Sequence, residues 1–331
     1  MATTLPDIRQ RPRRSVYAGR VDALAALLDG PRARGAFLLR CVLDPPWCLR
    51  IEDEAPLALT AVTRGRAWIR SDGDAPVALG PGDLVVARGP RPYTVADDPG
   101  TPPQAVIEPG GRCVALDGHE LREELALGVR SWGNAPDGGT VLLTGAYQLA
   151  GEVGRRLVRT LPDLLVLSAG DVASPLVPLL AEEIVRDEPG QEAVLDRLLD
   201  LLLISVLRGW LARPDSPTPA WYRGYADPVV GRALRLLQHN PAHGWTVRSL
   251  AAAAGVSRAA LARRFTELVG EPPMTYLTHY RLARAADLLR EPGATVGAVA
   301  RQVGYASPFA LSAAFKRVRG VSPQQFRAAL G

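Results

Sequence analysis

The stretch VRSLAAAAGVSRAALARRF, residues 247–265, returns in altered form as VGAVARQVGYASPFALSAAF, residues 296–315. Each copy has apolar residues at helical spacing, then a glycine, then a serine that opens a second apolar run. Glycine allows the positive φ of a tight turn, and a serine side chain can cap the first N–H groups of a helix. Leu261 and Phe265, at i and i+4, share one face of that helix. The two stretches therefore predict two helix-turn-helix units.

The positions at which the two copies match are those that a helix-turn-helix unit requires. The matched pairs are Thr246 and Thr295, Leu250 and Val299, Ala251 and Ala300, Gly255 and Gly304, Ser257 and Ser307, Leu261 and Leu311, Phe265 and Phe315, and Gly270 and Gly320. The outward face of each second helix holds the residues that differ. These are Arg258, Ala259, Ala262 and Arg263 in the first copy, and Pro308, Phe309, Ser312 and Ala313 in the second, with Lys316 and Arg317 near the helix end.

The two outward faces predict different contacts with DNA. An arginine of a recognition helix can bind guanine O6 and N7, which gives about 1–3 kcal/mol of discrimination. Arg258 and Arg263 therefore predict base reading by the first copy. In the second copy, Phe309 offers apolar contact, while the basic residues near the helix end suit phosphate contacts. We expect the second copy to position the protein on DNA, and the alternative is a purely structural buttress.

A further helix is predicted between the two units, over residues 274–290. Its apolar residues cover much of its circumference, so it can pack against both units. Such a helix would hold two recognition helices at a fixed distance, and these could enter successive major-groove segments about 34 Å apart. The apolar residues are Leu277, Tyr280, Leu282, Ala285, Ala286, Leu288 and Leu289.

The second copy continues into GVSPQQFR, residues 320–327, and from about residue 227 to 330 the chain resembles the AraC/XylS family of transcription regulators. The resemblance implies base readers at Ala259, Ala262 and Arg263, and at the four outward residues of the second copy. It also implies promoter DNA as a partner, with RNA polymerase as a further candidate. The residues that match the family pattern of the second unit are Ala300, Gly304, Tyr305, Ser307, Leu311, Phe315, Lys316, Gly320, Ser322, Pro323, Phe326 and Arg327.

The charge of the chain is unevenly distributed. Its 331 residues carry a net charge of +5, but residues 222–331 hold 15 basic and 5 acidic residues, while residues 1–221 hold 24 basic and 29 acidic ones. Lys316 is the only lysine. A basic C-terminal third on an acidic body favours a polyanionic partner. A solvated basic surface is the alternative.

The N-terminal part has a different pattern. From residue 35 to about residue 114, short apolar runs alternate with turn sequences such as GPGD, which predicts a small antiparallel barrel or sandwich. The predicted strands lie at 36–43, 57–65, 66–71, 76–80, 83–89 and 93–97, with one more at 140–149. The stretch 63–95 resembles a cupin-like sensor domain. We therefore expect an α+β chain of two domains, an N-terminal cupin-like antiparallel β-barrel with helices and a C-terminal all-α double helix-turn-helix domain. The expected boundaries are a flexible basic tail at 1–14, the sensor and dimerisation domain at 15–212, a linker at 213–222 and the DNA-binding domain at 223–331.

Residues 191–212 give a strong helical pattern with one broad apolar face. We expect this helix to pair with a copy of itself in a homodimer, and the alternative is a helix buried within its own domain. Three prolines in residues 212–221 prevent the helix from continuing and indicate the linker. The face consists of Leu195, Leu199, Leu202, Leu203, Val206, Leu207 and Trp210.

The sequence does not favour a metal site. Cupin enzymes resemble one another in placing two His and a Glu after the first glycine and another His further on. Here GRAWIRSDG, residues 65–73, has no His or Glu, and Tyr93 takes the last position. We expect no metal, no cofactor and no enzymatic activity. The alternative function is a cupin-type metalloenzyme with an appended helical domain.

The candidate sensor residues are Cys41, Cys48 and Cys113. Three cysteines do not make a disulfide framework. Nearby Arg40, Arg50 and Arg112 would lower the pKa of the thiols and make them sensors of a redox or thiol-reactive effector. The alternative is that the cysteines are small buried hydrophobes.

Another possibility for sensing is a small apolar ligand near Trp47 and Trp68, and the effector stays unknown at this point. The chain has no secretory signal pattern and no apolar run of the roughly 18 residues that a membrane span needs. We therefore expect a cytoplasmic protein without a membrane partner.

Overall fold

The structure is a computed structural model that describes residues 37–147, 158–171, 174–213 and 220–329. The predicted tail at 1–14 and most of the predicted linker, residues 214–219, lie outside the described residues. The domain boundaries predicted from the sequence therefore stay predictions.

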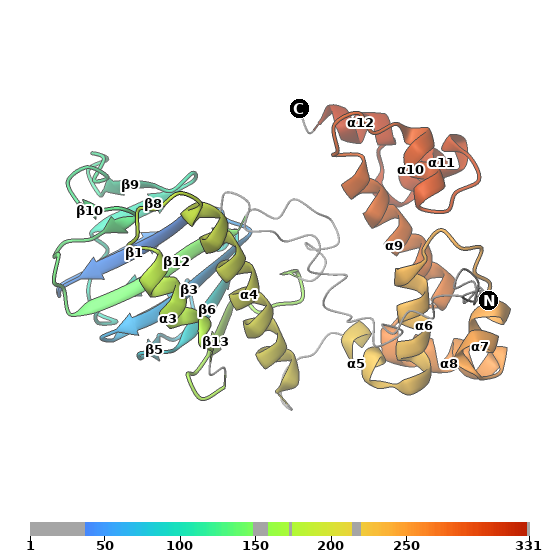
Figure 1. Ribbon diagram of the computed structural model, residues 1–331, viewed down its shortest axis with the longest axis horizontal. Helices are drawn as coiled ribbons and strands as arrows, with labels where there is room; N and C mark the ends of the chain where they lie inside the picture. The colour runs from blue at the N-terminus through green and yellow to red at the C-terminus, as the bar shows by residue number, and fades with distance from the viewer. Residues whose placement is uncertain (1–36, 148–157, 172–173, 214–219, 330–331) are drawn as a thin grey trace, which may run out of the picture.

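The strands form two sheets (Figure 1). In the seven-stranded sheet the order is β10 (Ala126–Gly128), β11 (Ser131–Trp132), β1 (Phe37–Leu43), β12 (Thr140–Tyr147), β3 (Leu57–Arg64), β6 (Leu84–Arg88) and β13 (Leu164–Leu167). In the six-stranded sheet it is β5 (Val77–Leu79), β4 (Ala67–Ser71), β7 (Tyr93–Ala96), β2 (Cys48–Ile51), β8 (Ala105–Glu108) and β9 (Arg112–Ala115).

The β-rich N-terminal domain expected from the sequence is present, but its described strands do not close into one barrel. The chain changes sheet at short turns, as between β1 and β2 and between β3 and β4. At the second turn Gly65 has φ +76°, and an added Cβ would lie 2.6 Å from Gly139 O, so only glycine fits there. Most pairs are antiparallel, but β1 pairs with β11 and β2 with β8 in parallel.

Strand β6 shows how one sheet serves two cores. Successive side chains of a strand point to opposite faces. Val85 and Ala87 pack in the core shared with the six-stranded sheet, whereas Leu84 and Val86 pack in a second core beneath two helices. A sheet with apolar residues on both faces needs a cover on each, and the helices supply one of them.

The helices that cover this sheet are α3 (Leu176–Glu183) and α4 (Gln191–Ala212), which has the bounds predicted for it (Figure 1). The predicted apolar face of α4 lies wholly in the core with β3, β6 and β12. Tyr147 of β12 donates its hydroxyl proton to Leu199 O at 2.8 Å. The expectation that this face pairs with a second copy is therefore wrong, because the sheet of the same chain already buries it.

The described C-terminal residues are helical. The helices are α5 (Ala220–Ala226), α6 (Pro228–His239), α7 (Val247–Ala254), α8 (Arg258–Val269), α9 (Pro273–Leu288), α10 (Val296–Gln302), α11 (Pro308–Arg319) and α12 (Pro323–Ala328). The sequence pattern predicts helices over residues 228–239, 247–254, 258–268, 274–290, 296–303, 308–318 and 323–330, and all the helices but α5 begin and end within one or two residues of these bounds. Helix α5 packs against α6 and α8 and begins inside the stretch assigned to the linker.

Helix α9 connects two small hydrophobic cores (Figure 1). Tyr276, Leu277 and Tyr280 of its first half belong to the core of α6–α8. Leu282 and Ala285 of its second half belong to the core of α10 and α11. The central helix predicted from the sequence thus packs against both units.

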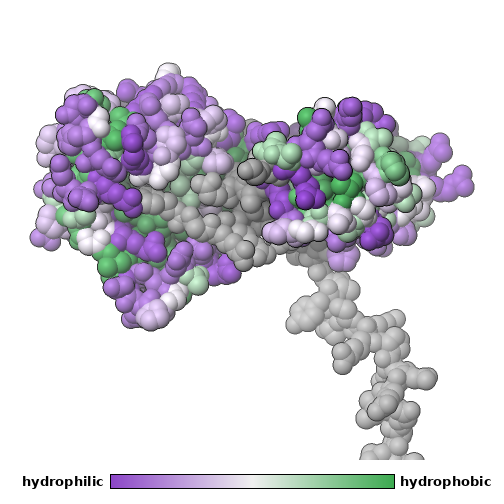
Figure 2. Space-filling view, turned by 90° about the horizontal axis from the view of Figure 1, so that it is seen from above, coloured by the Kyte–Doolittle hydropathy of each residue, from purple (hydrophilic) through white to green (hydrophobic). Residues whose placement is uncertain are grey.

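Within the described residues, no helix combines the length and the apolarity needed to cross a bilayer. On the face of the molecule shown in Figure 2, hydrophobic side chains form small areas among hydrophilic ones.

Candidate nucleic-acid interface

The first helix-turn-helix unit consists of α7 and α8, and side-chain caps fix both of its helix starts. Thr246 Oγ1 accepts a hydrogen bond from Ser249 N at 3.0 Å, and the two residues form a capping box. Gly255, with φ +77°, ends α7, and Ser257 Oγ then accepts from Ala260 N at 3.2 Å at the start of α8. The turn is therefore built by the residues that the sequence pattern singled out.

The second unit, α10 and α11, repeats these caps. Thr295 Oγ1 accepts from Ala298 N and Ser307 Oγ accepts from Ala310 N, each at 3.2 Å. Gly304 has φ +83° in the turn. Two helices with the same caps and turns are thus held at the two ends of α9.

The inward faces of α8 and α11 are fully buried. The remaining residues of the two helices form their outward faces. Leu261, Phe265, Leu311 and Phe315 are each 0% exposed. Outward, the structure exposes Arg258, Ala259, Arg263, Pro308, Phe309, Ala313, Lys316 and Arg317, while Ala262 and Ser312 are partly buried. All ten residues assigned to DNA contact from the sequence therefore lie on an outward face.

The two faces differ in chemistry. Helix α8 presents two guanidinium groups, whereas α11 presents Phe309, whose side chain is 86% exposed, beside Pro308 and Ala313. Lys316 and Arg317 follow in the last turn of α11. The first face can donate bidentate hydrogen bonds to base edges, and the second offers apolar contact followed by positive charge.

Arg263 forms an ion pair within its own helix. Its Nη1 lies 3.1 Å from Glu267 Oε1, at i and i+4, and its side chain is 71% exposed. Exposed pairs of this kind contribute only about 0.3–0.5 kcal/mol. The pair therefore orients the guanidinium without holding it firmly.

The neighbouring Arg264 has a structural role that the sequence did not reveal. Its Nε donates to Asp227 Oδ2 at 2.7 Å, while Asp227 Oδ1 caps α6 by accepting from the N–H groups of Val229 and Val230. Against the opposing effect of burial, these donors hold the pKa of Asp227 below its usual value. The partner lies 37 residues away in sequence, so no local pattern signals the contact.

The three candidate sensor cysteines are free thiols in the interior. Burial raises the pKa of Cys41 to about 12, with Cys113 adding to the effect, and raises that of Cys113 to about 11, with Glu120 adding to it. Burial and Asp97 also raise the pKa of Cys48, against the opposite influence of Arg70.

The expectation that neighbouring arginines lower the pKa of these thiols is therefore wrong. Arg50 forms ion pairs with Glu52 and Asp72, and Arg112 with Glu108. These two guanidinium groups therefore stabilise carboxylates and not thiolates. Arg40 is not among the causes of the shifts at the three thiols.

The two candidate tryptophans lie in different surroundings. Trp47 is 1% exposed in the core between the sheets, and Trp68 is partly buried on β4. The indole N–H groups of Trp47 and Trp132 are buried without a hydrogen-bond partner in the described part of the chain. Trp47 is therefore a core residue.

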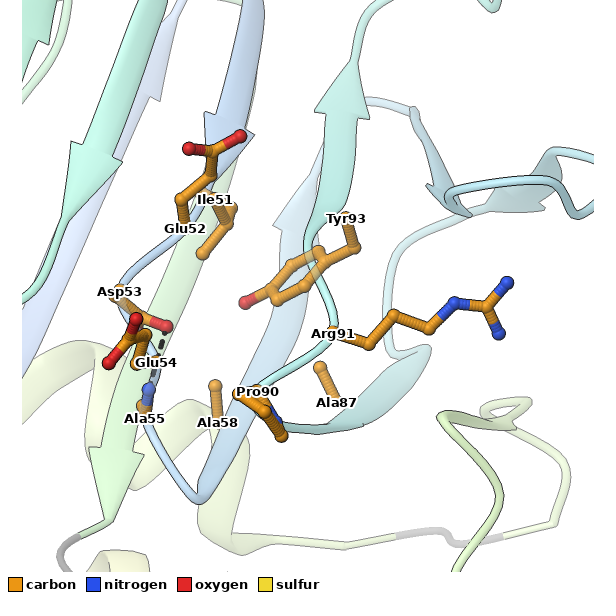
Figure 3. Close-up of a pocket in the computed structure, with 11 residues that line it drawn as sticks. Ile51, Glu52, Asp53, Glu54, Ala55, Ala58, Ala87, Pro90, Arg91 and Tyr93 are labelled. Atoms are coloured by element: carbon orange, nitrogen blue, oxygen red, sulfur yellow. Dashed lines mark hydrogen bonds between the residues drawn. The ribbon is translucent and has the colours of Figure 1, made fainter.

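A small pocket lies elsewhere, where β2 ends and β7 begins (Figure 3). The loop Glu52–Ala55 forms one wall, and Pro90 and Tyr93 form another. Asp53 accepts a hydrogen bond from Ala55 N at 3.0 Å, and burial raises its pKa. Tyr93, to which the cupin resemblance assigns the last ligand position, is 6% exposed and lines this pocket. The described residues contain no group of three His, Cys, Asp or Glu side chains placed to hold a metal ion.

Comparison with known proteins agrees with this architecture. A family described as "Cupin" matches residues 22–212, and one described as "Helix-turn-helix domain" matches residues 250–329. The chain is 33% identical to an AraC-like transcription regulator of Streptomyces antibioticus, over 93% of this chain and 98% of that protein. It is 27% identical to the HTH-type transcriptional regulator AlkR of Acinetobacter baylyi, over 93% of this chain and 99% of that protein.

Among solved structures, the chain is similar to the DNA-binding domain of AdpA in complex with a target DNA. The two are 37% identical with a TM-score of 0.29, and the match covers 31% of this chain and 92% of that chain. The family resemblance seen in the second helix-turn-helix unit is confirmed by the full-length relatives. The chain belongs to the AraC-like family of DNA-binding transcription regulators, with a cupin domain followed by a helix-turn-helix domain.

Proposed function

We propose that the chain reads promoter DNA mainly through α8, with Arg258 and Arg263 on base edges and Ala259 and Ala262 allowing close approach. Helix α11 positions the protein through Pro308, Phe309, Ser312 and Ala313, and Lys316 and Arg317 bind phosphates. The observation that carries this proposal is the contrast between two helices with the same caps and different outward faces.

The test is a comparison of two DNA-binding constants. Duplexes that bind the protein are first selected from a random pool, and affinities for a selected and a scrambled duplex are then measured by fluorescence anisotropy. Arg263→Ala should weaken binding to the selected duplex more than Phe309→Ala does. The reverse order would overturn the assigned division between the two helices.

We further propose that the protein acts as a homodimer through the outer surface of α3 and α4. The two helices pack against each other. Leu179 of α3, Val185 in the turn after α3, and Val194 and Leu201 of α4 are 45–51% exposed. The apolar face of α4 that the sequence suggested for the dimer is buried in the core of its own domain. The outer surface of α3 and α4 is therefore proposed as the dimer interface instead.

The cupin domain is proposed to sense an effector in the cytoplasm and to change how the dimer presents its DNA-binding units, with RNA polymerase as a further partner. A small molecule is favoured over a thiol-reactive signal, because the thiolate is the reactive form of cysteine and burial raises all three thiol pKa values. The small pocket lined by Tyr93 and Asp53 is one place among the described residues at which such a molecule could make first contact with the cupin domain.

The experiment for this part measures DNA binding with and without a thiol oxidant, in the wild type and in a variant with alanine at all three cysteines. We expect the oxidant to have the same small effect on both. An oxidant response that the triple variant lacks would restore the redox hypothesis. Metal analysis of the purified protein addresses the alternative of a cupin-type metalloenzyme, which stoichiometric iron or zinc would support.

A further inference from the structure

We propose that Arg281 is a positioning residue that fixes the orientation of α11 relative to α8. It thereby sets the spacing that one chain accepts between its two half-sites, which are the DNA segments that α8 and α11 contact. The proposal rests on the proposed function, in which α8 reads DNA bases and α11 positions the protein on the same DNA. Arg281 lies on α9 and contacts the loop that leads into the first unit as well as the turn of the second unit.

The contacts with the first unit are two hydrogen bonds. Arg281 Nε donates to Pro241 O at 2.7 Å, and Nη2 donates to His243 O at 2.9 Å. Both carbonyls belong to the loop between α6 and α7, which leads directly into the first unit. The loop is itself held, because Trp245 Nε1 donates to Asn240 O at 3.1 Å.

The contact with the second unit is with an aromatic ring. The guanidinium carbon of Arg281 lies 5.9 Å from the centroid of the Tyr305 ring. Tyr305 stands in the turn between α10 and α11, and its N–H donates to Ala300 O at 2.8 Å. Arginine can bind two carbonyls with its planar edge while its face stacks on a ring, whereas lysine cannot do both.

The backbone of the second unit also lies against the loop that precedes α7. A Cβ added to Gly304 would lie 2.6 Å from Ala242 Cα, in the same loop that Arg281 binds. The matching Gly255 of the first unit has nearly the same φ, yet an added Cβ there would have no atom within 4 Å. The close approach at Gly304 is therefore a property of the junction between the units and not of the turn itself.

If α9 were the only connection, the two units could rotate relative to each other more freely than they can with the Arg281 contact in place. Long helices bend, and each half of α9 is held in a different core. A second contact away from the helix axis turns the pair into a rigid body. Loss of the Arg281 contact should leave both cores intact while the angle between α8 and α11 varies.

The first experiment varies the distance between the two half-sites of a selected duplex by one base pair in each direction. One base pair rotates a half-site by about 35° around the duplex. The wild type should bind the selected spacing at least about tenfold more tightly than its neighbours. In Arg281→Gln the preference should fall below about threefold, with Arg281→Lys between the two.

The matched control is Arg284→Gln, one turn further along α9, where the described residues give no hydrogen bond or ion pair to the guanidinium. This change should lower affinity equally at every spacing or leave it unaltered. A wild-type spacing preference in Arg281→Gln would overturn the proposal, as would a flattened preference in Arg284→Gln.

The second experiment needs no DNA. Spin labels are attached to cysteines at positions 259 and 313 in a full-length background with alanine at the three native cysteines, and the distance distribution is measured by double electron–electron resonance. The distribution should be narrow with Arg281 and broader in Arg281→Gln and Arg281→Lys. Equal widths would refute the positioning role. If the wild type lacks any spacing preference, α11 recognises no DNA sequence of its own, and the spin-label distances still decide the role of Arg281.

Discussion

Arg263 carries its positive charge beside a carboxylate of its own helix. The exposed pair with Glu267 is worth about 0.3–0.5 kcal/mol, whereas a bidentate contact with guanine gives about 1–3 kcal/mol of discrimination. If the Arg263 guanidinium leaves Glu267 to bind a guanine, the gain exceeds the loss, and the protein–DNA complex is favoured. The neighbouring Arg264 is ion-paired with Asp227, whose side chain is mostly buried, so its guanidinium does not leave this partner for DNA as easily.

Substitution of Arg263 should separate specific from nonspecific binding. Arg263→Ala is expected to weaken binding to a selected duplex by roughly 5–150-fold, and binding to a scrambled duplex much less. Arg263→Lys should keep the nonspecific affinity but not the specific one, because lysine lacks the planar fork. Anisotropy titrations at one salt concentration measure both, and equal losses on the two duplexes would contradict base reading. Glu267→Gln serves as a control that should not weaken specific binding.

The buried thiols should be unreactive in the folded chain. The pKa of Cys113 is raised from 9.0 to about 11, so the folded state holds this proton more tightly than the unfolded state. The resulting stabilisation is complete below pH 9 and is lost as the pH rises toward 11. Iodoacetamide at pH 8, followed by mass spectrometry, should modify none of the three thiols without denaturant and all three in denaturant. Rapid native labelling of any one would show that the thiol is accessible.

At the scale of elements, the two turn glycines should respond differently to substitution. Both have positive φ, which costs a non-glycine residue about 1–3 kcal/mol. Gly304→Ala also forces a Cβ against Ala242 and should destabilise more than Gly255→Ala. Hydrogen exchange of peptides from residues 296–319 and 247–269 measures each unit separately in the full chain. Equal effects would contradict the close approach at Gly304.

Much of the C-terminal half could be predicted because its signals are local. Helices α6 and α7 have the predicted bounds, since Asp227 and Thr246 cap them and apolar spacing marks their faces. Strands β2, β8, β9, β10, β11 and β13 were not predicted. None is longer than four residues, and β13, for example, is defined by its pairing with β6. The apolar face of α4 was read correctly, but its partner was not, because periodicity identifies a buried face without saying what buries it.

At the scale of the whole molecule, the outer surface of α3 and α4 governs the proposed dimer. Leu201→Glu should convert dimer to monomer in size-exclusion chromatography with light scattering, because a buried charge without a partner is costly. Leu116→Glu, at a residue 69% exposed outside this surface, is the matched control and should leave the mass unchanged. A dimer that survives Leu201→Glu would place the interface elsewhere.

The candidate site shows the same division between local and distant information. The repeat identified the outward residues, because helical geometry alone tells which residues remain once the apolar face is assigned to the core. The contacts of Arg264 and Arg281 depend on partners far away in sequence, up to 40 residues from the arginine, and only the folded chain reveals them.

Lys316 stands exposed in the last turn of α11, and the chain has no other lysine. The only side-chain amine is therefore on the proposed DNA-facing side. Amine-directed chemistry can attach a fluorophore to that helix without any substitution in the protein, with the α-amino group of the chain as a second reactive amine. The same amine would be shielded when DNA is bound, so its rate of modification would report occupancy of the second unit on an otherwise native chain.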